Sequence, residues 1–240
     1  MALDEALMHR AGERNECFLR VYEWVRPTLS LGRNQSARGR YDLARAAALG
    51  IDIVRRPTAG RAVLHHREIT YSVTAPVDAI GDLRESYGAL NRILLHALAR
   101  MDITAEIATP VARTPAPDTL PCFDAAAPGE IVAGGRKLVG SAQVREKGVL
   151  LQHGSVLIAD DQSLASELVL CSTGVASKPA TLFEQLGRVP AATELAEAMV
   201  AALGAETGQA VHPLITDKAL MQSATALRLK YESDAWTWRR

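Results

Sequence analysis

The spacing of hydrophobic residues along this 240-residue chain alternates between a helical period and a strand period. Residues 82–101 carry the clearest helical pattern, because apolar side chains recur there every three or four positions. The residues that share this face are Leu83, Tyr87, Leu90, Ile93, Leu94, Ala97 and Leu98. Shorter helical patterns predict helices at 2–10, 41–50, 180–187, 191–206 and 217–230.

Alternating and β-branched residues predict the strands. They indicate strands at 17–25, within 26–35, at 51–57, as an extended pair over 61–76, and as a three-stranded meander over 130–159. Glycines supply the two hairpin turns of the meander, at 134–135 and 147–148. A β-rich middle with helices around it predicts an α+β fold, a mixed β-sheet flanked by helices. We expect one domain over 1–240, whose residues from about 180 to 240 form a helical C-terminal part.

The composition of the chain argues against several classes of function. Lys plus Arg and Asp plus Glu number 27 each, and this balance argues against a broad basic surface for nucleic acid. The N-terminal residues do not resemble a secretory signal, and no run of 18 uncharged apolar residues predicts a membrane span. The cysteines, Cys17, Cys122 and Cys171, are odd in number and widely spaced. We therefore expect a cytoplasmic protein without a disulfide framework or a metal site.

A first candidate for chemistry is "RRPTAGRAVLHH", residues 55–66. A strand delivers Arg55 and Arg56 to a glycine-containing turn, whose N–H groups could face an anion or a carbonyl. The alternative is an ordinary hairpin with its arginines on the solvent face. The glycine spacing matches neither a Walker A loop nor a dinucleotide fingerprint. His65 and His66 are adjacent, so only one of them can face inward from a strand.

The second candidate is Lys137 in "GGRKLVGSAQ". Strict alternation predicts that Lys137, Val139 and Ser141 share one face of a strand. The other face would then carry Leu138, Gly140 and Ala142. The small residues leave room beside the lysine for a polarised carbonyl or a thiolate, whose pKa the cation would lower. The alternative is a lysine exposed on a strand.

The third candidate is Cys122, which lies 137 − 122 = 15 residues before Lys137 in a proline-rich loop over 108–129. A long loop could bring this thiol over a neighbouring pocket, where a nearby cation would activate it as a nucleophile. Alternatively Cys122 is a small buried hydrophobe, an interpretation that suits Cys17 and Cys171 better. His153, at the end of a strand, either lines a pocket or is structural.

Taken together and in this order, these segments resemble the biotin/lipoate protein ligase superfamily. The segments are "RRPTAGRAVLHHREITYSV", "CFDAAAPGEI" and "GGRKLVGSAQVREKGVLLQHGSV". The resemblance is strongest to the cysteine-dependent octanoyltransferases, runs from "MALDEAL" to about residue 190, and includes "LSLGRNQ". It implies the class II aminoacyl-tRNA-synthetase-like fold of the biotin and lipoate ligases.

The resemblance also implies roles for individual residues. The family's lysine segment, whose lysine points into the acyl pocket, is matched by Lys137, Gly140, Ser141 and Ala142. The family's "C-F" segment is matched by Cys122 and Phe123, which makes Cys122 the nucleophile and Lys137 the group that lowers its pKa. The acyl-pocket segments are matched by Arg56, Thr58, Gly60, Arg61, Ala62, His65, His153 and Gly154. The chain departs from the pattern at Ala59, where the family usually has a glycine, and in "AAAPGE" after "CFD".

The implied activity is octanoyl transfer in lipoate biosynthesis, without ATP or another cofactor. Octanoyl acyl carrier protein would be the donor, and the acceptor a lysine of a lipoyl domain, such as that of glycine-cleavage H protein or of a 2-oxoacid dehydrogenase acyltransferase subunit. An amidotransferase between lipoyl domains would use the same residues. An ATP-dependent lipoate–protein ligase would need no cysteine. A non-enzymatic lipoyl-domain binding module is disfavoured because Cys122 and Lys137 are both present. A biotin ligase has a different glycine spacing.

Overall fold

A computed structural model describes residues 1–109, 123, 129–170 and 178–240. Its larger sheet has six strands in the order β1-β5-β9-β8-β7-β6, and neighbouring strands are antiparallel throughout. The strands are β1 (Phe18–Tyr22), β5 (Glu68–Pro76), β6 (Glu106–Ile107), β7 (Ile131–Ala133), β8 (Arg136–Glu146) and β9 (Val149–Leu157). The predicted meander over 130–159 therefore forms β7, β8 and β9.

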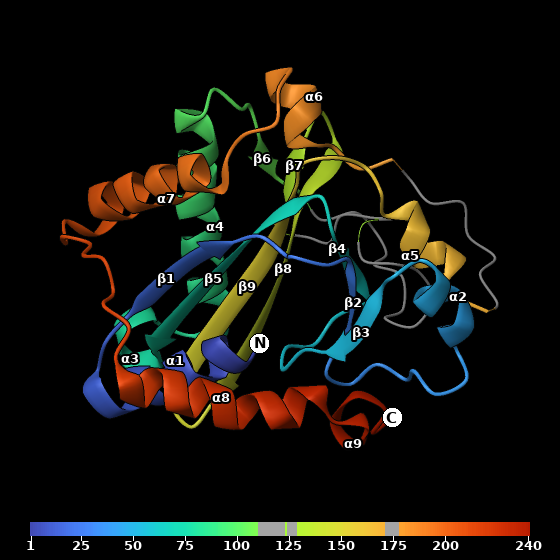
Figure 1. The fold of residues 1–240 in the computed structure, drawn as a ribbon. Helices are drawn as coiled ribbons and strands as arrows, with labels where there is room; N and C mark the ends of the chain where they lie inside the picture. The colour runs from blue at the N-terminus through green and yellow to red at the C-terminus, as the bar shows by residue number, and fades with distance from the viewer. Residues whose placement is uncertain (110–122, 124–128, 171–177) are drawn as a thin grey trace.

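A smaller sheet lies beside the larger one (Figure 1). Its strands are β2 (Thr28–Leu31), β3 (Asp52–Arg55) and β4 (Val63–His65). Strand β2 is central, parallel to β3 and antiparallel to β4. The chain thus combines a mixed sheet with an antiparallel one, as the α+β prediction requires.

Two helices cover one face of the larger sheet, namely α4 (Leu83–Arg100) and α7 (Ala192–Thr207) (Figure 1). Their apolar side chains join the inward side chains of β5, β8 and β9 in the largest core cluster. Asp82 caps α4 by accepting hydrogen bonds from the backbone N–H groups of Arg84 and Glu85, and the Glu85 carboxylate accepts from the N–H of Asp82. This capping box and the apolar stripe explain why the predicted helix forms.

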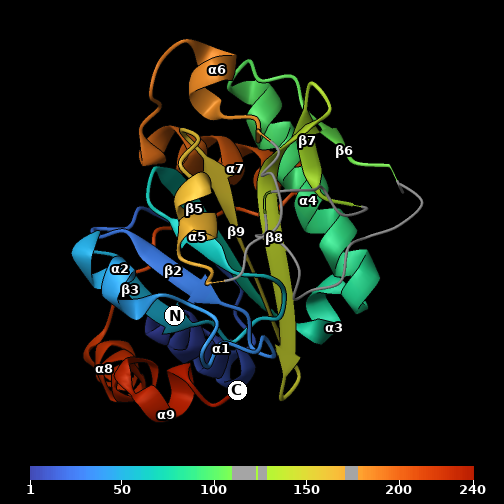
Figure 2. The same cartoon turned by 90° about the vertical axis from the view of Figure 1, so that its right-hand side faces the viewer.

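The opposite face of the larger sheet is covered in part by α1 (Ala2–Arg14), and α8 (Lys218–Glu232) lies against α1. Figure 2 shows the smaller sheet beside α1, with α8 and the C-terminus at the same end of the molecule. Between the two sheets, no helix of the described residues covers this face. The remaining space is where the candidate site lies.

The other helices are short. They are α2 (Leu43–Ala48), α3 (Val77–Ile80), α5 (Ser163–Glu167), α6 (Leu182–Leu186) and α9 (Asp234–Thr237). The sequence pattern did not predict α3, α5, α9 or the two-residue strand β6, because so few residues cannot display a period. No helix in the described ranges has the length and apolar character needed to span a bilayer.

Candidate active site

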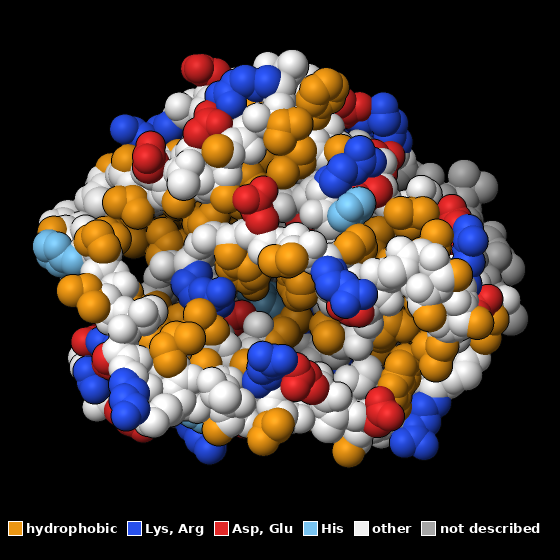
Figure 3. Space-filling view, in the orientation of Figure 1, with side chains coloured by type: hydrophobic (Ala, Val, Ile, Leu, Met, Phe, Trp, Pro, Cys, Tyr) orange, Lys and Arg blue, Asp and Glu red, His pale blue; other side chains and the backbone are white. Residues whose placement is uncertain are grey.

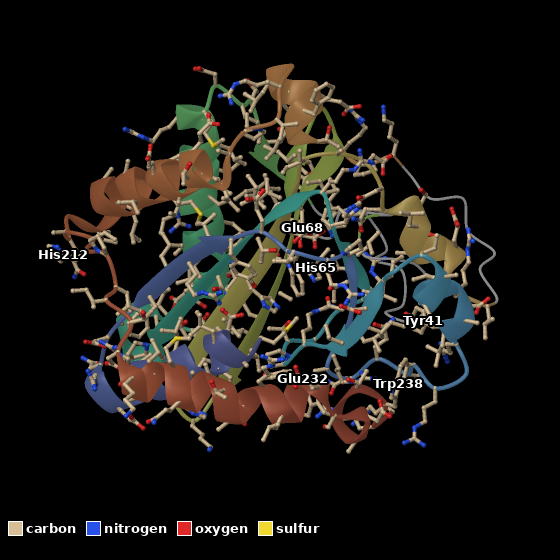
Figure 4. All side chains as sticks on the ribbon, viewed as in Figure 1. Tyr41, His65, Glu68, His212, Glu232 and Trp238 are labelled. Carbon is tan, nitrogen blue, oxygen red and sulfur yellow. The ribbon has the colours of Figure 1, made fainter. Side chains whose placement is uncertain are left out.

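A cavity of about 200 Å³ lies between the two sheets. Figure 3 shows the surface hollowed near the centre of the view, where Figure 4 labels His65. Its floor is a row across three neighbouring strands, because Gly140 of β8 pairs with Ser155 of β9, and Ser155 pairs with Thr70 of β5. The other lining residues include Met1, Tyr22, Trp24, Ser30, Arg56, Gly60, Arg61, Val63, His65, Glu130, Ser141, Ala142, His153 and Gly154.

The turn after β3 forms one wall of the cavity, and Arg56 holds it in shape. The buried Arg56 guanidinium donates to the carbonyl oxygens of Ala59 (2.9 Å), Arg61 (2.7 Å) and Ser30 (2.8 Å), and to Oγ1 of Thr58 (3.1 Å). The interpretation of Arg56 as a solvent-facing hairpin arginine is therefore wrong. The backbone carbonyl oxygens that accept these hydrogen bonds stabilise the positive charge. The same hydrogen bonds hold the wall in shape before a substrate binds.

Two glycines allow the turn to form. Gly60 has a φ of 100°, in the region that favours glycine, and a Cβ there would lie 2.9 Å from an Arg56 nitrogen. A Cβ on Gly32, in the "LSLGRNQ" segment, would lie 1.9 Å from the carbonyl oxygen of Gly60. Ala59, where the family usually has glycine, is not among the described residues with positive φ. Its alanine side chain therefore fits this turn.

Arg55, the neighbour of Arg56, is also buried but points away from the cavity wall. Its guanidinium donates to the carbonyl oxygens of Gly32 (2.6 Å), Gln35 (2.8 Å) and Thr237 (2.9 Å). Arg55 thus fastens the segment after β2 to the C-terminal helix α9. The two arginines of "RRPTAG" have different structural partners, although the sequence presents them as a pair.

Two histidines line the cavity: His153 hydrogen-bonds to a threonine, and His65 lies beside a carboxylate. His153 forms a 2.6 Å hydrogen bond with Oγ1 of Thr58, and burial lowers the pKa of His153 to about 3, so its ring is neutral. His65 stacks on Trp24 with ring centroids 4.3 Å apart, and its Nδ1 lies 2.8 Å from Glu68. His66 instead points to Asp161 with a side chain that is 40% exposed, as the prediction that only one of the two faces inward requires.

Lys137 is buried and paired. Its Nζ lies 2.8 Å from both carboxylate oxygens of Glu130, and the two side chains are 1% and 8% exposed. The ring of Phe123 lies over the ammonium, 5.0 Å from its centroid, within the range of a cation–π interaction. The alternative of an exposed strand lysine is therefore wrong. Sequence reasoning missed the role of Glu130, which was quoted only as part of the "CFDAAAPGEI" segment and was not named as a partner of the lysine.

The predicted alternation of β8 is also wrong at Lys137. Val132 pairs with Lys137, but Ile131 pairs with Val139, so β8 has one extra residue, Leu138, at a β-bulge. Leu138 and Val139 both enter the core under α4. Lys137 moves to the face of Gly140, where its Cε would lie 3.3 Å from an added Cβ. The bulge is what turns the lysine toward the cavity side of the sheet.

Gly140 and Gly154 shape the space beside Lys137. A Cβ on Gly140 would lie 3.1 Å from Cζ of Phe123. A Cβ on Gly154 would lie 2.6 Å from the ring of Tyr71, whose hydroxyl is 2.7 Å from Oγ of Ser141. The serine side chain therefore bonds into the core. The missing Cβ of Gly154 leaves room for the Tyr71 ring, and that of Gly140 leaves room beside Lys137 and Phe123.

Nine of the eleven predicted acyl-binding residues line this one cavity. They are Arg56, Gly60, Arg61, His65, Gly140, Ser141, Ala142, His153 and Gly154. Thr58 and Ala62 are buried behind the wall, where Thr58 bonds to Arg56 and His153, and Ala62 packs in the core of the smaller sheet. Both support the pocket from outside.

Cys122, the predicted nucleophile, lies outside the described residues, as does Cys171. The next residue, Phe123, is buried and packs with Val63 and Leu157 beside Lys137. The interpretation of Cys17 as a small buried hydrophobe is wrong, because this thiol is exposed. Desolvation raises its pKa, which reduces its thiolate fraction. Within the described ranges, no group of three or more His, Cys, Asp or Glu side chains is arranged to hold a metal ion.

This arrangement suits chemistry on an acyl group. A cavity floored by small side chains can enclose an alkyl chain, and a buried cation whose carboxylate partner lines the cavity can stabilise negative charge on a carbonyl oxygen or a thiolate. The neutral His153 and the fully engaged Arg56 keep the rest of the wall rigid. These features define the pocket without fixing the reaction.

Comparison with known proteins gives consistent matches. Residues 1–204 match the family described as the lipoyl protein ligase A/B catalytic domain. Octanoyltransferase LipM of Kyrpidia tusciae is 38% identical over 262 residues, covering 100% of this chain and 94% of the relative. Octanoyltransferase LipM of Symbiobacterium thermophilum is 35% identical, covering 100% of this chain and 93% of the relative.

Solved structures show a similar fold at low sequence identity. Lipoate-protein ligase A bound with ATP has a TM-score of 0.81 at 21% identity, covering 99% of this chain and 92% of that one. A bipartite lipoate protein ligase of Thermoplasma acidophilum, described with its E2 lipoyl domain, has a TM-score of 0.74 at 20% identity, covering 99% and 89%. These two likenesses confirm the predicted ligase-type fold.

Proposed function

The chain belongs to the lipoyl protein ligase A/B catalytic domain family and is a transferase, and we propose that it moves an octanoyl group from acyl carrier protein to a lysine of a lipoyl domain. The observation that carries this proposal is the buried Lys137, which pairs with Glu130 and lies beside Gly140, two residues that line a cavity of about 200 Å³. The two LipM relatives that match the whole chain are named octanoyltransferases, and the "CF" segment stands upstream of the lysine as it does in that branch.

In the first half-reaction, the Cys122 thiolate attacks the carbonyl carbon of the octanoyl thioester. A new C–S bond forms, the bond to the carrier's sulfur breaks, and the carrier leaves as a thiolate that takes up a proton. The Lys137 ammonium supports this step by electrostatic stabilisation of the attacking thiolate and of the carbonyl oxygen as it gains charge. The alkyl chain would lie along the row formed by Gly140, Ser155 and Thr70.

In the second half-reaction, the neutral ε-amine of the acceptor lysine attacks the octanoyl-Cys122 carbonyl. An amide bond forms, the C–S bond to Cys122 breaks, and the amine's surplus proton is lost as the thiolate of Cys122 returns. Because the thioester is already activated, neither half-reaction requires ATP. The same pocket serves both steps, so donor and acceptor would bind in turn.

The test is intact mass spectrometry of the purified protein mixed with octanoyl acyl carrier protein in the absence of ATP. We expect an octanoyl adduct on the wild type that hydroxylamine removes, because a thioester reacts with hydroxylamine. Cys122→Ala should form no adduct, and Cys17→Ala is the matched control that should behave as the wild type. An adduct that persists in Cys122→Ala would contradict the proposed nucleophile.

Two alternatives are distinguished in the same assay. An amidotransferase would take octanoyl from an octanoylated lipoyl domain and leave the acyl carrier protein donor untouched. A ligase would transfer lipoate or octanoate to an apo lipoyl domain only when ATP and Mg²⁺ are added. The ligase is disfavoured because the octanoyltransferase relatives cover the full chain at 35–38% identity, whereas the ligase structures share about 20%.

A further inference from the structure

An arginine-rich surface borders the turn that walls the cavity. It consists of Arg33, Arg38, Arg239 and Arg240, which we call the arginine face. The guanidinium of Arg239 donates to the carbonyl oxygen of Arg33 (2.7 Å), and that of Arg38 donates to the carbonyl oxygen of Trp238. The backbone N–H of Arg38 lies 3.3 Å from a backbone oxygen of Arg240. Two segments some 200 residues apart in sequence are therefore held side by side.

The positive charge of the arginine face is only partly compensated. Arg33 pairs with Glu146 at 3.3 Å, and no other carboxylate side chain is recorded against the four arginines within the described residues. Burial and the charges of Arg33 and Arg240 lower the pKa of Arg239. The buried Arg55 lies beneath them, and its pKa is lowered by burial and by Arg239 and Arg240. Within the described residues, the guanidinium groups of Arg33, Arg38, Arg55, Arg239 and Arg240 thus share one carboxylate side chain, that of Glu146.

The arginine face is continuous with the cavity wall. The backbone N–H of Arg33 donates to the carbonyl oxygen of Thr58 (2.8 Å), and its neighbour Gly32 packs on the carbonyl of Gly60. Gly60 and Arg61 line the cavity. A macromolecule that docks on the arginine face therefore lies next to the turn, within reach of the pocket.

We propose that the arginine face docks an acidic surface of the carrier protein that delivers the acyl thioester. This inference rests on the proposed function. A cavity of about 200 Å³ admits the acyl chain but no part of a folded carrier, so recognition of the carrier must use the surface around the cavity. Clustered charge beside a cleft raises the association rate of a partner of opposite sign.

The donor is a better fit than the acceptor. The acceptor must bring a lysine, which is a cation in water, toward the same pocket, and a positive surface beside the pocket opposes that approach. The thioester group of the donor is uncharged and meets no such opposition. The backbone hydrogen bonds of Arg38 and Arg239 hold their side chains in place, which reduces the entropy lost on docking.

The test compares two donors in the first half-reaction. The rate of octanoyl-Cys122 formation is measured with octanoyl acyl carrier protein and with octanoyl-N-acetylcysteamine, a small thioester without a protein surface. The variant R38E/R240E reverses two exposed charges of the arginine face. The matched control R92E/R100E reverses two exposed charges on α4, on the opposite side of the larger sheet.

For R38E/R240E we expect kcat/KM with the protein donor to fall at least tenfold, while kcat/KM with the small thioester stays at the wild-type value. The wild-type rate with the protein donor should fall as salt is raised, and the variant should lose much of this dependence. R38Q/R240Q should fall between the two, and R92E/R100E should match the wild type.

Equal rates with the protein donor in R38E/R240E and wild type would overturn the docking proposal, as would an equal fall with both donors. A fall of the same size in R92E/R100E would also overturn it, because the effect would then follow net charge and not location. If the wild type forms an adduct with neither donor, the proposed function itself fails. The small thioester thus separates the failure of docking from the failure of chemistry.

Discussion

Removing one partner of the buried Lys137–Glu130 pair should destabilise the fold more than removing both. The two side chains are 1% and 8% exposed, and Nζ lies 2.8 Å from both carboxylate oxygens. Glu130→Gln leaves the lysine's charge buried without its counter-charge, and Lys137→Met does the same to the carboxylate. Breaking such a pair costs about 3–5 kcal/mol, whereas apolar replacement of a whole pair is often close to neutral.

The measurements are thermal unfolding and urea unfolding, both followed by circular dichroism. A loss of about 3–5 kcal/mol corresponds to a fall in Tm of roughly 6–20 °C for a chain of this size. The double variant Glu130→Gln/Lys137→Met should recover part of that loss. Arg228→Gln, which breaks the exposed Arg228–Glu232 pair on α8, is the control and should leave the urea midpoint nearly unchanged. Figure 4 labels Glu232 on that helix.

Two results would refute this reasoning. If both single variants unfold at the wild-type midpoint, the stability of the fold does not depend on the pairing of the two charges. If the double variant loses the sum of the two single losses, the two sites act independently and the coupling is absent. A change in the m-value alone would instead report a change in the compactness of one of the states.

Three further predictions follow from the cavity wall and floor. Gly154→Ala should cost about 1–3 kcal/mol in urea unfolding, because its Cβ would lie 2.6 Å from the ring of Tyr71. Gly32→Ala should cost about 3 kcal/mol and slow octanoyl-enzyme formation, because its Cβ would lie 1.9 Å from the carbonyl oxygen of Gly60 and displace the turn. The folded-state pKa of His153 is about 3, below its unfolded value of 6.5, so the unfolded state binds the proton first and stability falls as pH drops below about 6.5. The expected loss from this group is about 2 kcal/mol between pH 7.5 and pH 5, and a His153→Gln variant should show a shallower fall of stability over the same range.

The local sequence pattern predicted the long helices and strands but not the short ones. Helix α4 shows its apolar stripe over five turns, and this period was enough to predict the helix. Helices α3, α5 and α9 have four or five residues each and exist because of the elements around them. Helix α9, for example, is held by the buried guanidinium of Arg55, which donates to the carbonyl of Thr237. Nothing within residues 234–237 encodes that contact.

The candidate site was predictable as a set of residues but not as a geometry. Arg56 was identified as a pocket residue, yet its observed contacts are with the backbone of its own turn and of β2, which only the folded structure reveals. Glu130 was missed because a single carboxylate before a strand has no signature. It becomes a candidate only when the strand pairing shows which lysine it meets.

The bulge at Leu138 shows why alternation fails where the site is built. In an unbroken strand, Lys137 would share the face of Val139 and would have to bury its ammonium beneath α4 among apolar side chains, without a counter-charge. One extra residue transfers Lys137 to the other face, where Glu130 and the ring of Phe123 receive it. The alternation of residues in β8 therefore does not reveal the bulge, but the charged residue next to it does. A lysine that strict alternation would place in the core indicates that the strand breaks its register beside it.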